Sequence, residues 1–104
     1  MEKIKALFIF LDETADSTKH RATVDTPSVA LTVVGVSSLE VAVKTAKQFV
    51  REGKADLVEL CGSCGYRVAK AVHEAVGDQA AVGMIVHQFD NGPIICKLIK
   101  KWEG

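Results

Sequence analysis

The sequence predicts an α/β fold, with a mainly parallel sheet of four to five strands, two crossover helices and a possible C-terminal helix. Continuous apolar runs alternate along the chain with segments whose apolar residues recur at helical spacing. With 104 residues the chain suits one compact domain, so we expect residues 1–104 to share one core. Hydrophobic residues make up 48% of the chain and aromatic residues 6%, so Val, Ile, Leu and Ala are expected to fill that core.

The balance of charge argues against several classes of partner. The chain has 13 basic and 13 acidic residues, interspersed along the sequence. Its net charge is therefore zero, and we expect no positive surface potential that would attract nucleic acid or an anionic membrane. The apolar runs 6–11 and 80–86 are far shorter than the roughly 20 residues that a membrane-spanning helix needs. Three cysteines do not suit a secreted disulfide framework, and the start of the chain resembles neither a signal nor a transit peptide. We therefore expect a cytoplasmic protein.

The first third of the chain is expected to form strands. Residues 3–11 are an almost unbroken apolar run, typical of a strand buried on both faces. Residues 12–19 are polar and without an apolar period, which indicates an exposed loop. Residues 21–25 and 29–36 are rich in β-branched side chains on either side of Pro27, and they are expected to form a hairpin or a bent edge strand.

Two helices are expected in the middle of the chain. Ser37 and Glu40 have the spacing of a capping box, an apolar stripe follows over residues 39–50, and Gly53 supplies a left-handed stop. A short strand over residues 55–60 leads through a glycine-bearing turn into a second stripe, which ends at Gly77. Together these segments read as strand, turn and crossover helix.

The end of the chain offers two alternatives. Residues 80–86 predict a last buried strand, and residues 91–93 (Asn-Gly-Pro) mark a turn or a helix start. The apolar residues beyond line one face of a closing helix, although a strand remains the alternative: Ile94, Ile95, Leu98, Ile99 and Trp102. A small chain with such a segment is expected to need a partner to cover it, which favours a homo-oligomer.

Polar residues at the strand ends locate a candidate site. In open α/β sheets, ligands bind beyond the carboxyl ends of the strands. Asp12 follows the first strand, Glu59 and Cys61 close the third apolar run, and His87 and Gln88 end the last one. With parallel strands, all five lie on one rim, although strand ends are also simply where polar residues begin.

The turn Cys61-Gly62-Ser63-Cys64-Gly65 carries the sharpest signal. Gly62 and Gly65 remove side chains where a backbone bends or approaches a ligand, and a helix starting near Ser63 would aim free N–H groups at an anion. Arg67 is placed to add a donor. The alternative is a tight connection with Ser63 as a helix cap. His20 and Arg21 either close over the same anion or are surface charges.

The cysteines allow two further chemistries. Cys61 and Cys64 have the C-x-x-C spacing, and a helix N-terminus stabilises a thiolate, so thiol redox chemistry is allowed. Zinc would require Cys96 with His87 or His20 as further ligands and lacks a second close pair, so no metal is expected. Cys96 is expected to be a packed thiol. Glu59 is either exposed at a strand edge or, if buried unpaired, a candidate acid or base.

Several short motifs resemble a family of small prokaryotic proteins of unknown function, DUF6506. They are residues 6–10, Lys19-His20-Arg21-Ala22, residues 32–36, Glu59-Leu60-Cys61-Gly62 and Val82-Gly83. The resemblance covers roughly residues 4–90 and implies an α/β domain without a known activity. The family's turn usually reads Glu-Leu-Cys-Gly-Gly-Phe-Gly, so Ser63 and Cys64 depart from it. That departure implies that a dithiol is not chemistry shared by the family.

Three functions follow as hypotheses. The first is a module that binds a small anionic metabolite at the turn, with Glu59, Asp12, His87 and the His20-Arg21 segment around it. The second is a thiol redox enzyme that uses Cys61 with Cys64. The third is a structural homo-oligomer without catalysis. The sequence identifies no cofactor.

Overall fold

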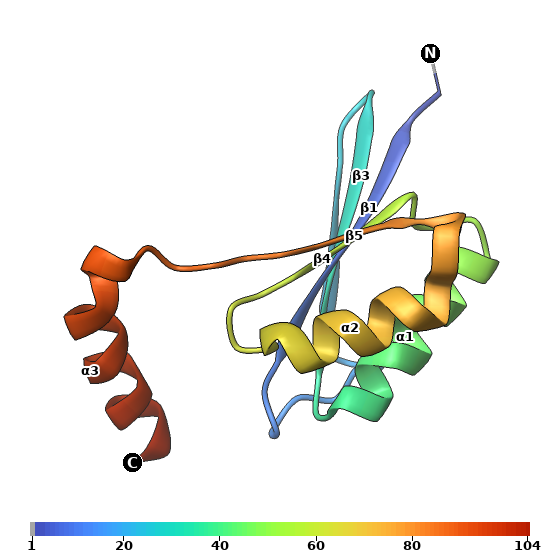
Figure 1. Cartoon of the computed structure of the whole chain (residues 1–104). Coiled ribbons are helices and arrows are strands. Elements are labelled where there is room, and N and C mark those ends of the chain that lie inside the picture. The colour runs from blue at the N-terminus through green and yellow to red at the C-terminus, as the bar shows by residue number, and fades with distance from the viewer. Residues whose placement is uncertain (1) are drawn as a thin grey trace.

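The computed structural model describes residues 2–104, over which five strands and three α-helices alternate (Figure 1). The strands are β1 (Ile4–Leu11), β2 (Arg21–Asp25), β3 (Val29–Val36), β4 (Leu57–Leu60) and β5 (Ala81–Met84). The α-helices are α1 (Leu39–Arg51), α2 (Gly65–Val76) and α3 (Gly92–Glu103). Two short 3-10 helices, η1 (Gly77–Gln79) and η2 (Phe89–Asn91), precede β5 and α3.

The strands form one sheet in the order β2-β3-β1-β4-β5. Strand β1 pairs in parallel with β3 and β4, and β4 pairs in parallel with β5. Only the hairpin of β2 and β3 is antiparallel, and Pro27 lies in its turn outside the ladder. The predicted α/β fold with a mainly parallel sheet is therefore confirmed.

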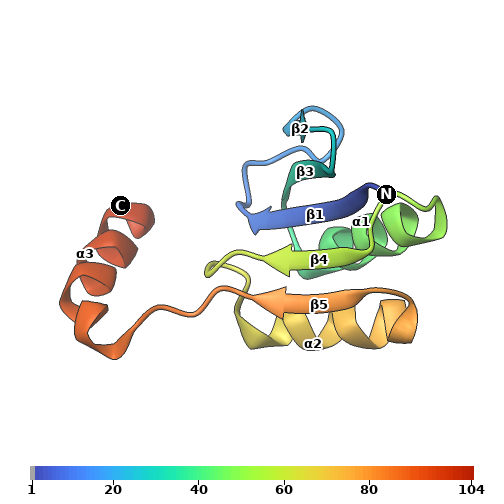
Figure 2. The ribbon, with the colours of Figure 1, turned by 90° about the horizontal axis from the view of Figure 1, so that it is seen from above.

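Both crossover helices cover the same face of the sheet, and the topology explains why. The connections β3-α1-β4 and β4-α2-β5 step across the sheet in the same direction, and right-handed crossovers in one direction place their helices on one face. A helix between β1 and β3 would step the other way and cover the opposite face. Strand β2 occupies that connection instead, so in the part of the chain that the structure describes the opposite face carries no helix (Figure 2).

The core lies between the sheet and helices α1 and α2. Leu7 and Ile9 of β1 and Val58 and Leu60 of β4 are fully buried there, because alternate side chains of each strand point to the helices. The helices contribute small and branched residues at helical spacing: Ala42, Ala46, Val68 and Val72. This is the aliphatic core that the composition predicts.

The other face of the sheet is open, which corrects two expectations. Strand β1 is not buried on both faces, because Phe8 and Phe10 on the helix-free side are only half-buried. The run 80–86 is not a buried strand either: β5 lies at the sheet edge, and beyond it Ile85 and Val86 are 43% and 69% exposed. An apolar run indicates a preference for burial, but burial also requires another element to pack on the run. The topology provides no such element for these side chains.

The helix ends test the predicted signals residue by residue. Gly53 has a φ of 69° and Gly77 a φ of 62°, so both glycines end their helices as predicted. The predicted Ser37 cap is wrong by one residue: the N-cap of α1 is Ser38, whose Oγ accepts a hydrogen bond from the Val41 N–H at 3.2 Å. Only Ser37 has a glutamate at capping-box spacing, so the sequence pattern favours it, whereas the backbone conformation places Ser38 at the cap.

Helix α3 stands apart from the rest of the chain (Figure 1). It is a helix, as the first alternative predicted, but it does not close onto the core: none of its residues is buried. The molecule is consequently elongated, measuring 43 × 26 × 25 Å. Cys96 lies on this helix and is exposed, so the expectation of a packed thiol is wrong.

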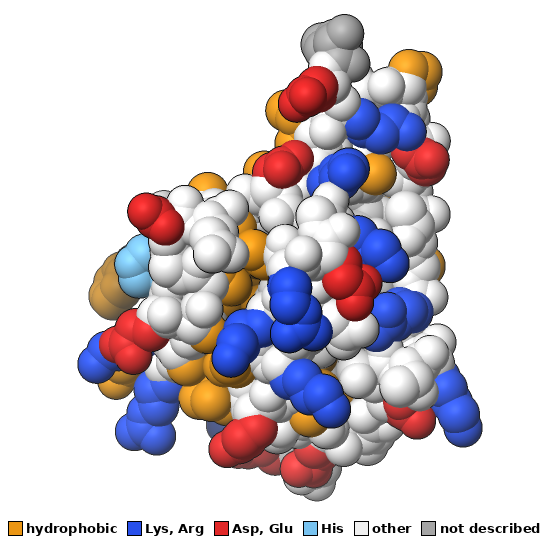
Figure 3. Space-filling model, turned by 90° about the vertical axis from the view of Figure 1, so that its right-hand side faces the viewer, with side chains coloured by type: hydrophobic (Ala, Val, Ile, Leu, Met, Phe, Trp, Pro, Cys, Tyr) orange, Lys and Arg blue, Asp and Glu red, His pale blue; other side chains and the backbone are white. Residues whose placement is uncertain are grey.

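On the side of the molecule shown in Figure 3, Lys and Arg side chains lie across the middle, and acidic side chains lie among and around them. The ion pair of Lys70 with Glu74, one helical turn away on α2, joins two exposed side chains. No helix within residues 2–104 combines the length and the apolar character that crossing a bilayer requires.

Candidate functional site

The glycine-bearing turn joins the end of β4 to the start of α2. The Cys61 N–H donates to the Ile9 carbonyl at 2.9 Å, and the Cys64 N–H donates back to the Cys61 carbonyl at 3.0 Å. Gly65 then adopts a φ of 71°, a left-handed conformation that favours glycine, and α2 begins. The main chain therefore bends sharply into a helix, as the glycine pattern predicts.

Ser63 anchors the turn to β1 and does not cap the helix. Its Oγ accepts a hydrogen bond from the Leu11 N–H at 3.3 Å and lies 3.1 Å from the Leu11 carbonyl oxygen, to which it donates. The same Oγ lies 2.6 Å from the Cys61 Sγ. A hydroxyl has a single proton, so turning it from the carbonyl to the sulfur stabilises a thiolate at Cys61.

Cys61 and Cys64 are neighbours in space with different surroundings. Their Sγ atoms lie 3.8 Å apart. Cys61 is half-buried at the end of β4, whereas Cys64 is 6% exposed, belongs to the core cluster and lies 3.6 Å from the Ile9 carbonyl oxygen. One thiol is thus reachable from solvent, and the other is reachable mainly through it.

The pKa values of the two thiols shift in opposite directions. At Cys61 partial burial opposes ionisation, but donation from the Ser63 hydroxyl and the N–H groups of Leu11 and Ser63 holds the pKa below its ordinary value. At Cys64 burial, followed by the charge of Cys61, raises the pKa to about 12. Near neutral pH the pair is therefore poised as one thiolate-prone sulfur beside one thiol.

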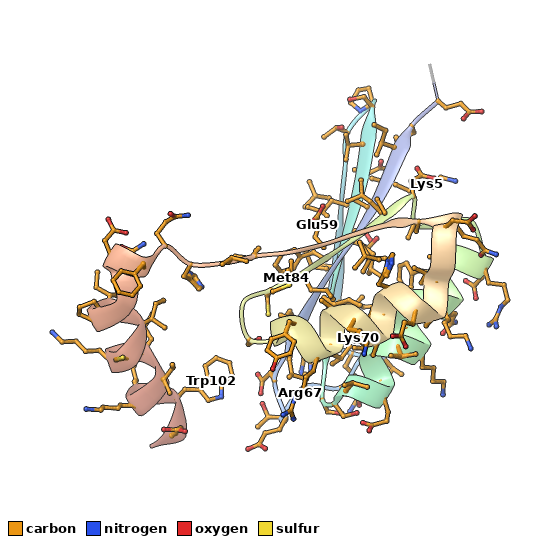
Figure 4. All side chains as sticks on the ribbon, viewed as in Figure 1. Lys5, Glu59, Arg67, Lys70, Met84 and Trp102 are labelled. Carbon is orange, nitrogen blue, oxygen red and sulfur yellow. The ribbon has the colours of Figure 1, made fainter. Side chains whose placement is uncertain are left out.

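A cleft of about 400 Å³ opens beside the turn. Gly62, Ser63 and His87 form its wall on the main body, and four apolar side chains with Glu103 form the wall on α3. The His87 ring lies directly over Gly62: a Cβ there would come 2.9 Å from the His87 Nε2. Figure 4 shows Trp102 reaching from α3 toward the body across this cleft.

A second cavity of about 560 Å³ adjoins the first, with Ser63, Trp102 and Glu103 common to both. It brings together three carboxylates, those of Asp12, Glu13 and Glu103. The N–H and hydroxyl of Thr14 donate to Asp12 and hold its pKa below the ordinary value, so this carboxylate is charged. Asp12 and His87 therefore lie at the rim beside the turn, as the strand-end argument predicts.

His20 and Arg21 are held elsewhere. The Asp16 N–H donates to the His20 Nδ1 at 2.8 Å, and the Arg21 guanidinium lies 5.6 Å from the centre of the Phe49 ring. Arg21 begins β2, which β3 and β1 separate from β4 in the sheet. Neither residue lines a cavity at the turn. Arg67 in the first turn of α2 is exposed and lines neither cavity.

Glu59 lies on the helix-free face of the sheet, on the opposite side from Arg67 (Figure 4). Its carboxylate extends over Gly83, where a Cβ would come 2.6 Å from the Oε2. The side chain is half-buried, and among the ion pairs and hydrogen bonds of residues 2–104 none involves its carboxylate. It is separated from the two cysteines by the sheet itself, so it is no partner for their protons.

The part of the chain that the structure describes holds no cluster of three His, Cys, Asp or Glu side chains able to bind a metal ion. Cys96, on α3, is remote from the pair at positions 61 and 64 in the fold. A zinc site with that cysteine therefore has no geometric support.

Comparison with known proteins places the chain in a family. The family model for a family of unknown function, DUF6506, matches residues 4–99. The chain belongs to the DUF6506 family. No curated protein and no solved structure matches it. The match extends past the expected residue 90, so most of α3 is part of the DUF6506 pattern and not an unrelated tail.

Two features of this DUF6506 site could not be predicted from the sequence. The groups that act on Cys61 include the backbone of Leu11, which precedes Ser63 by 52 residues. Only the parallel pairing of β1 with β4 brings them together. The sequence predicts the apolar stripe of α3, but it does not predict that this stripe lies opposite His87 across the cleft.

Proposed function

We propose that this DUF6506 protein carries out thiol–disulfide exchange, with Cys61 as the attacking thiolate and Cys64 as the resolving thiol. The observation that carries the proposal is the 3.8 Å separation of two sulfurs whose pKa values shift in opposite directions. A lowered pKa at the accessible sulfur supplies the nucleophile, and a neighbouring thiol completes the exchange.

The reaction consumes a disulfide substrate and balances in two steps. The Cys61 thiolate attacks one sulfur of R–S–S–R, the substrate bond breaks, and one thiolate leaves and takes up a proton. Cys64 then loses its proton to solvent and attacks the Cys61 Sγ, which forms the internal disulfide and releases the second thiolate. The substrate gains two electrons and the cysteine pair loses two.

The first step prepares the second. The thiolate charge of Cys61 is one of the causes that hold the pKa of Cys64 at about 12. The mixed disulfide has no such charge, so its formation lowers the pKa of Cys64 toward the range in which it can attack. The remaining movement is small, because the sulfurs need only close from 3.8 Å to the roughly 2.0 Å of a disulfide.

Anion binding at the turn has less support. The cavity that reaches Ser63 is lined by the carboxylates of Asp12, Glu13 and Glu103, which repel an anion, and the basic residues His20 and Arg21 lie across the sheet. The hypothesis of a small anionic ligand stays a prediction. Because Cys61 fits the family turn and Cys64 departs from it, the resolving step is proposed for this chain alone.

The experiment uses the Cys96→Ser chain, which retains only the pair, with glutathione disulfide as the probe. We expect two glutathione thiols released per chain and a chain lighter by two hydrogen atoms. Cys64→Ser should stop at a mixed disulfide on Cys61 with one thiol released, because the resolving sulfur is missing. Mass spectrometry of the chain and thiol counting distinguish these products.

Two outcomes would refute this function. One is a Cys61→Ser chain that reacts as fast as the parent, and the other is a Cys64→Ser chain that still releases two thiols. Ser63→Ala serves as the tuning variant: without the hydroxyl the pKa of Cys61 rises, and the first step at pH 7 should slow severalfold while both products remain.

A further inference from the structure

Within residues 2–104, two apolar surfaces are not covered by other parts of the chain. One is the helix-free face of the sheet and the other is the stripe along α3. The helix-free face takes no part in the proposed thiol chemistry, since Cys64 faces the helix-covered core, and the α3 stripe contributes only the apolar far wall of the cleft beside the turn. Soluble monomers rarely expose contiguous apolar patches beyond a few hundred Å².

The helix-free face is apolar at almost every position. Alternation along the paired strands places Ala6 beside Leu31 and Leu57, and Phe8 beside Val33 and Glu59. Glu59 is the one charged side chain that the central strands β1, β3 and β4 present on this face. Its carboxylate has no cationic partner among residues 2–104.

The α3 stripe has complementary properties. Its large side chains are 51–67% exposed at four positions, namely Ile94, Leu98, Ile99 and Trp102. At 100° per residue, Lys97 and Lys101 flank this stripe on one side. The α3 stripe is therefore an apolar surface bordered by lysines, and the helix-free face is an apolar surface with a single carboxylate. The two surfaces are complementary in both polarity and charge.

The exposed area is sufficient for a stable dimer. From Ile85 to Trp102, seven large apolar side chains are each 43% exposed or more. Together with the half-buried apolar side chains of the helix-free face, those that lie on α3 offer an area on the order of the 800 Å² that each partner buries in a standard interface.

We propose that a second copy of this chain covers these surfaces, with α3 of each protomer packed on the helix-free sheet face of the other. Lys97 or Lys101 then reaches the partner's side of the interface at the position of Glu59. The exchange is reciprocal, so a two-fold axis relates the protomers and the assembly closes at two. The apolar stripe and the apolar sheet face are buried together in a single step.

The position of α3 favours a second copy over the chain's own sheet. Residues 85–88 continue from β5 away from the body, and α3 lies beyond the carboxyl ends of the strands, not over the helix-free face (Figures 1 and 2). The helix buries none of its residues in its own chain. The DUF6506 match reaches residue 99, so it includes the stripe as far as Ile99 and leaves out Trp102.

The first test is the solution mass, measured by light scattering and by sedimentation. The parent chain should be a dimer, and Leu98→Asp should raise the dimer dissociation constant by at least about tenfold. This variant should leave the protomer folded, because Leu98 is 54% exposed and no residue of α3 is buried in its own chain. Tyr66→Asp is the matched control: Tyr66 is 72% exposed on α2, outside the proposed interface, and its substitution should leave the dimer intact.

The second test is a zero-length carbodiimide cross-link in a mixture of isotope-labelled and unlabelled chains. We expect links between Glu59 and Lys97 or Lys101 that join labelled to unlabelled chains, and none in Glu59→Gln. A monomeric parent, or links confined to one chain, would overturn the proposal, since the second result means that α3 folds back on its own sheet. Sedimentation of the parent with phosphatidylserine vesicles would also overturn it, because the stripe would then belong to a membrane surface.

Discussion

The two faces of the sheet differ in how far one chain completes them. On the covered face, Leu7 and Val58 point toward the helices and are completely shielded from water. On the other face, Phe8 and Glu59, their neighbours along the same strands, remain half-exposed. Composition is similar on both faces, and the direction of the crossovers makes the difference. Burial in this protein is therefore set by topology as much as by hydrophobicity.

The thiol pair belongs to the completed region. Cys64 lies in the core cluster with Ile9 and Leu60, and Cys61 packs against that cluster. The proposed thiol site therefore needs only one protomer, whereas the proposed dimer covers the helix-free face and α3. The following predictions compare these regions, beginning with the largest effect.

Leu7→Ala should lower the free energy of unfolding by about 2–5 kcal/mol, because it opens a cavity in the covered face. Leu98→Ala should change it by less than about 0.5 kcal/mol when measured at concentrations where the chain is monomeric, since α3 buries nothing there. Denaturant titrations give both values. Equal losses at the two positions would show that α3 packs within the protomer.

Gly35→Ala probes the best-packed corner of the helix-free side. A Cβ at Gly35 would come 2.5 Å from the Phe10 Cζ and 3.1 Å from the Ala15 Cβ, so the ring must move. We expect a loss of about 1–3 kcal/mol. Gly92→Ala, with nothing within 4 Å of the added methyl, is the control and should be near neutral. A tolerated Gly35→Ala would mean that this corner is as loose as the rest of its face.

Ser38→Ala should cost about 1 kcal/mol, because it leaves the Val41 N–H at the start of α1 without its hydrogen bond. Ser37→Ala makes no such loss and should stay within about 0.5 kcal/mol of the parent. Thermal unfolding of the two variants distinguishes the residues. A larger effect at Ser37 would restore the capping box that the sequence suggests.

How much the sequence could predict depends on the range of each interaction. Gly53 and Gly77 were predictable because a left-handed helix end is a local requirement of one residue. The nearness of Cys61 to Cys64 was predictable for the same reason, since it follows from spacing within one turn. The open face was not, because an apolar run such as β1 does not reveal which crossovers will cover it.

Site residues that depend on strand order were the hardest to place. His20 and Arg21 looked like partners of the turn, but β3 and β1 stand between their strand and β4. His87 was placed correctly at the rim, since it follows a strand parallel to β4. The role of Ser63 was missed because its partner Leu11 is contributed by a distant strand.

The thiolate titration of the Cys96→Ser chain, followed by ultraviolet absorbance, tests the central claim most directly. One thiolate, assigned to Cys61 by its loss in Cys61→Ser, should form below the ordinary cysteine pKa of about 8.5. The second should not form until the pH approaches about 12, the value to which burial raises the pKa of Cys64. Two thiols that titrate together near 8.5 would contradict the account, because neither would then be prepared for attack.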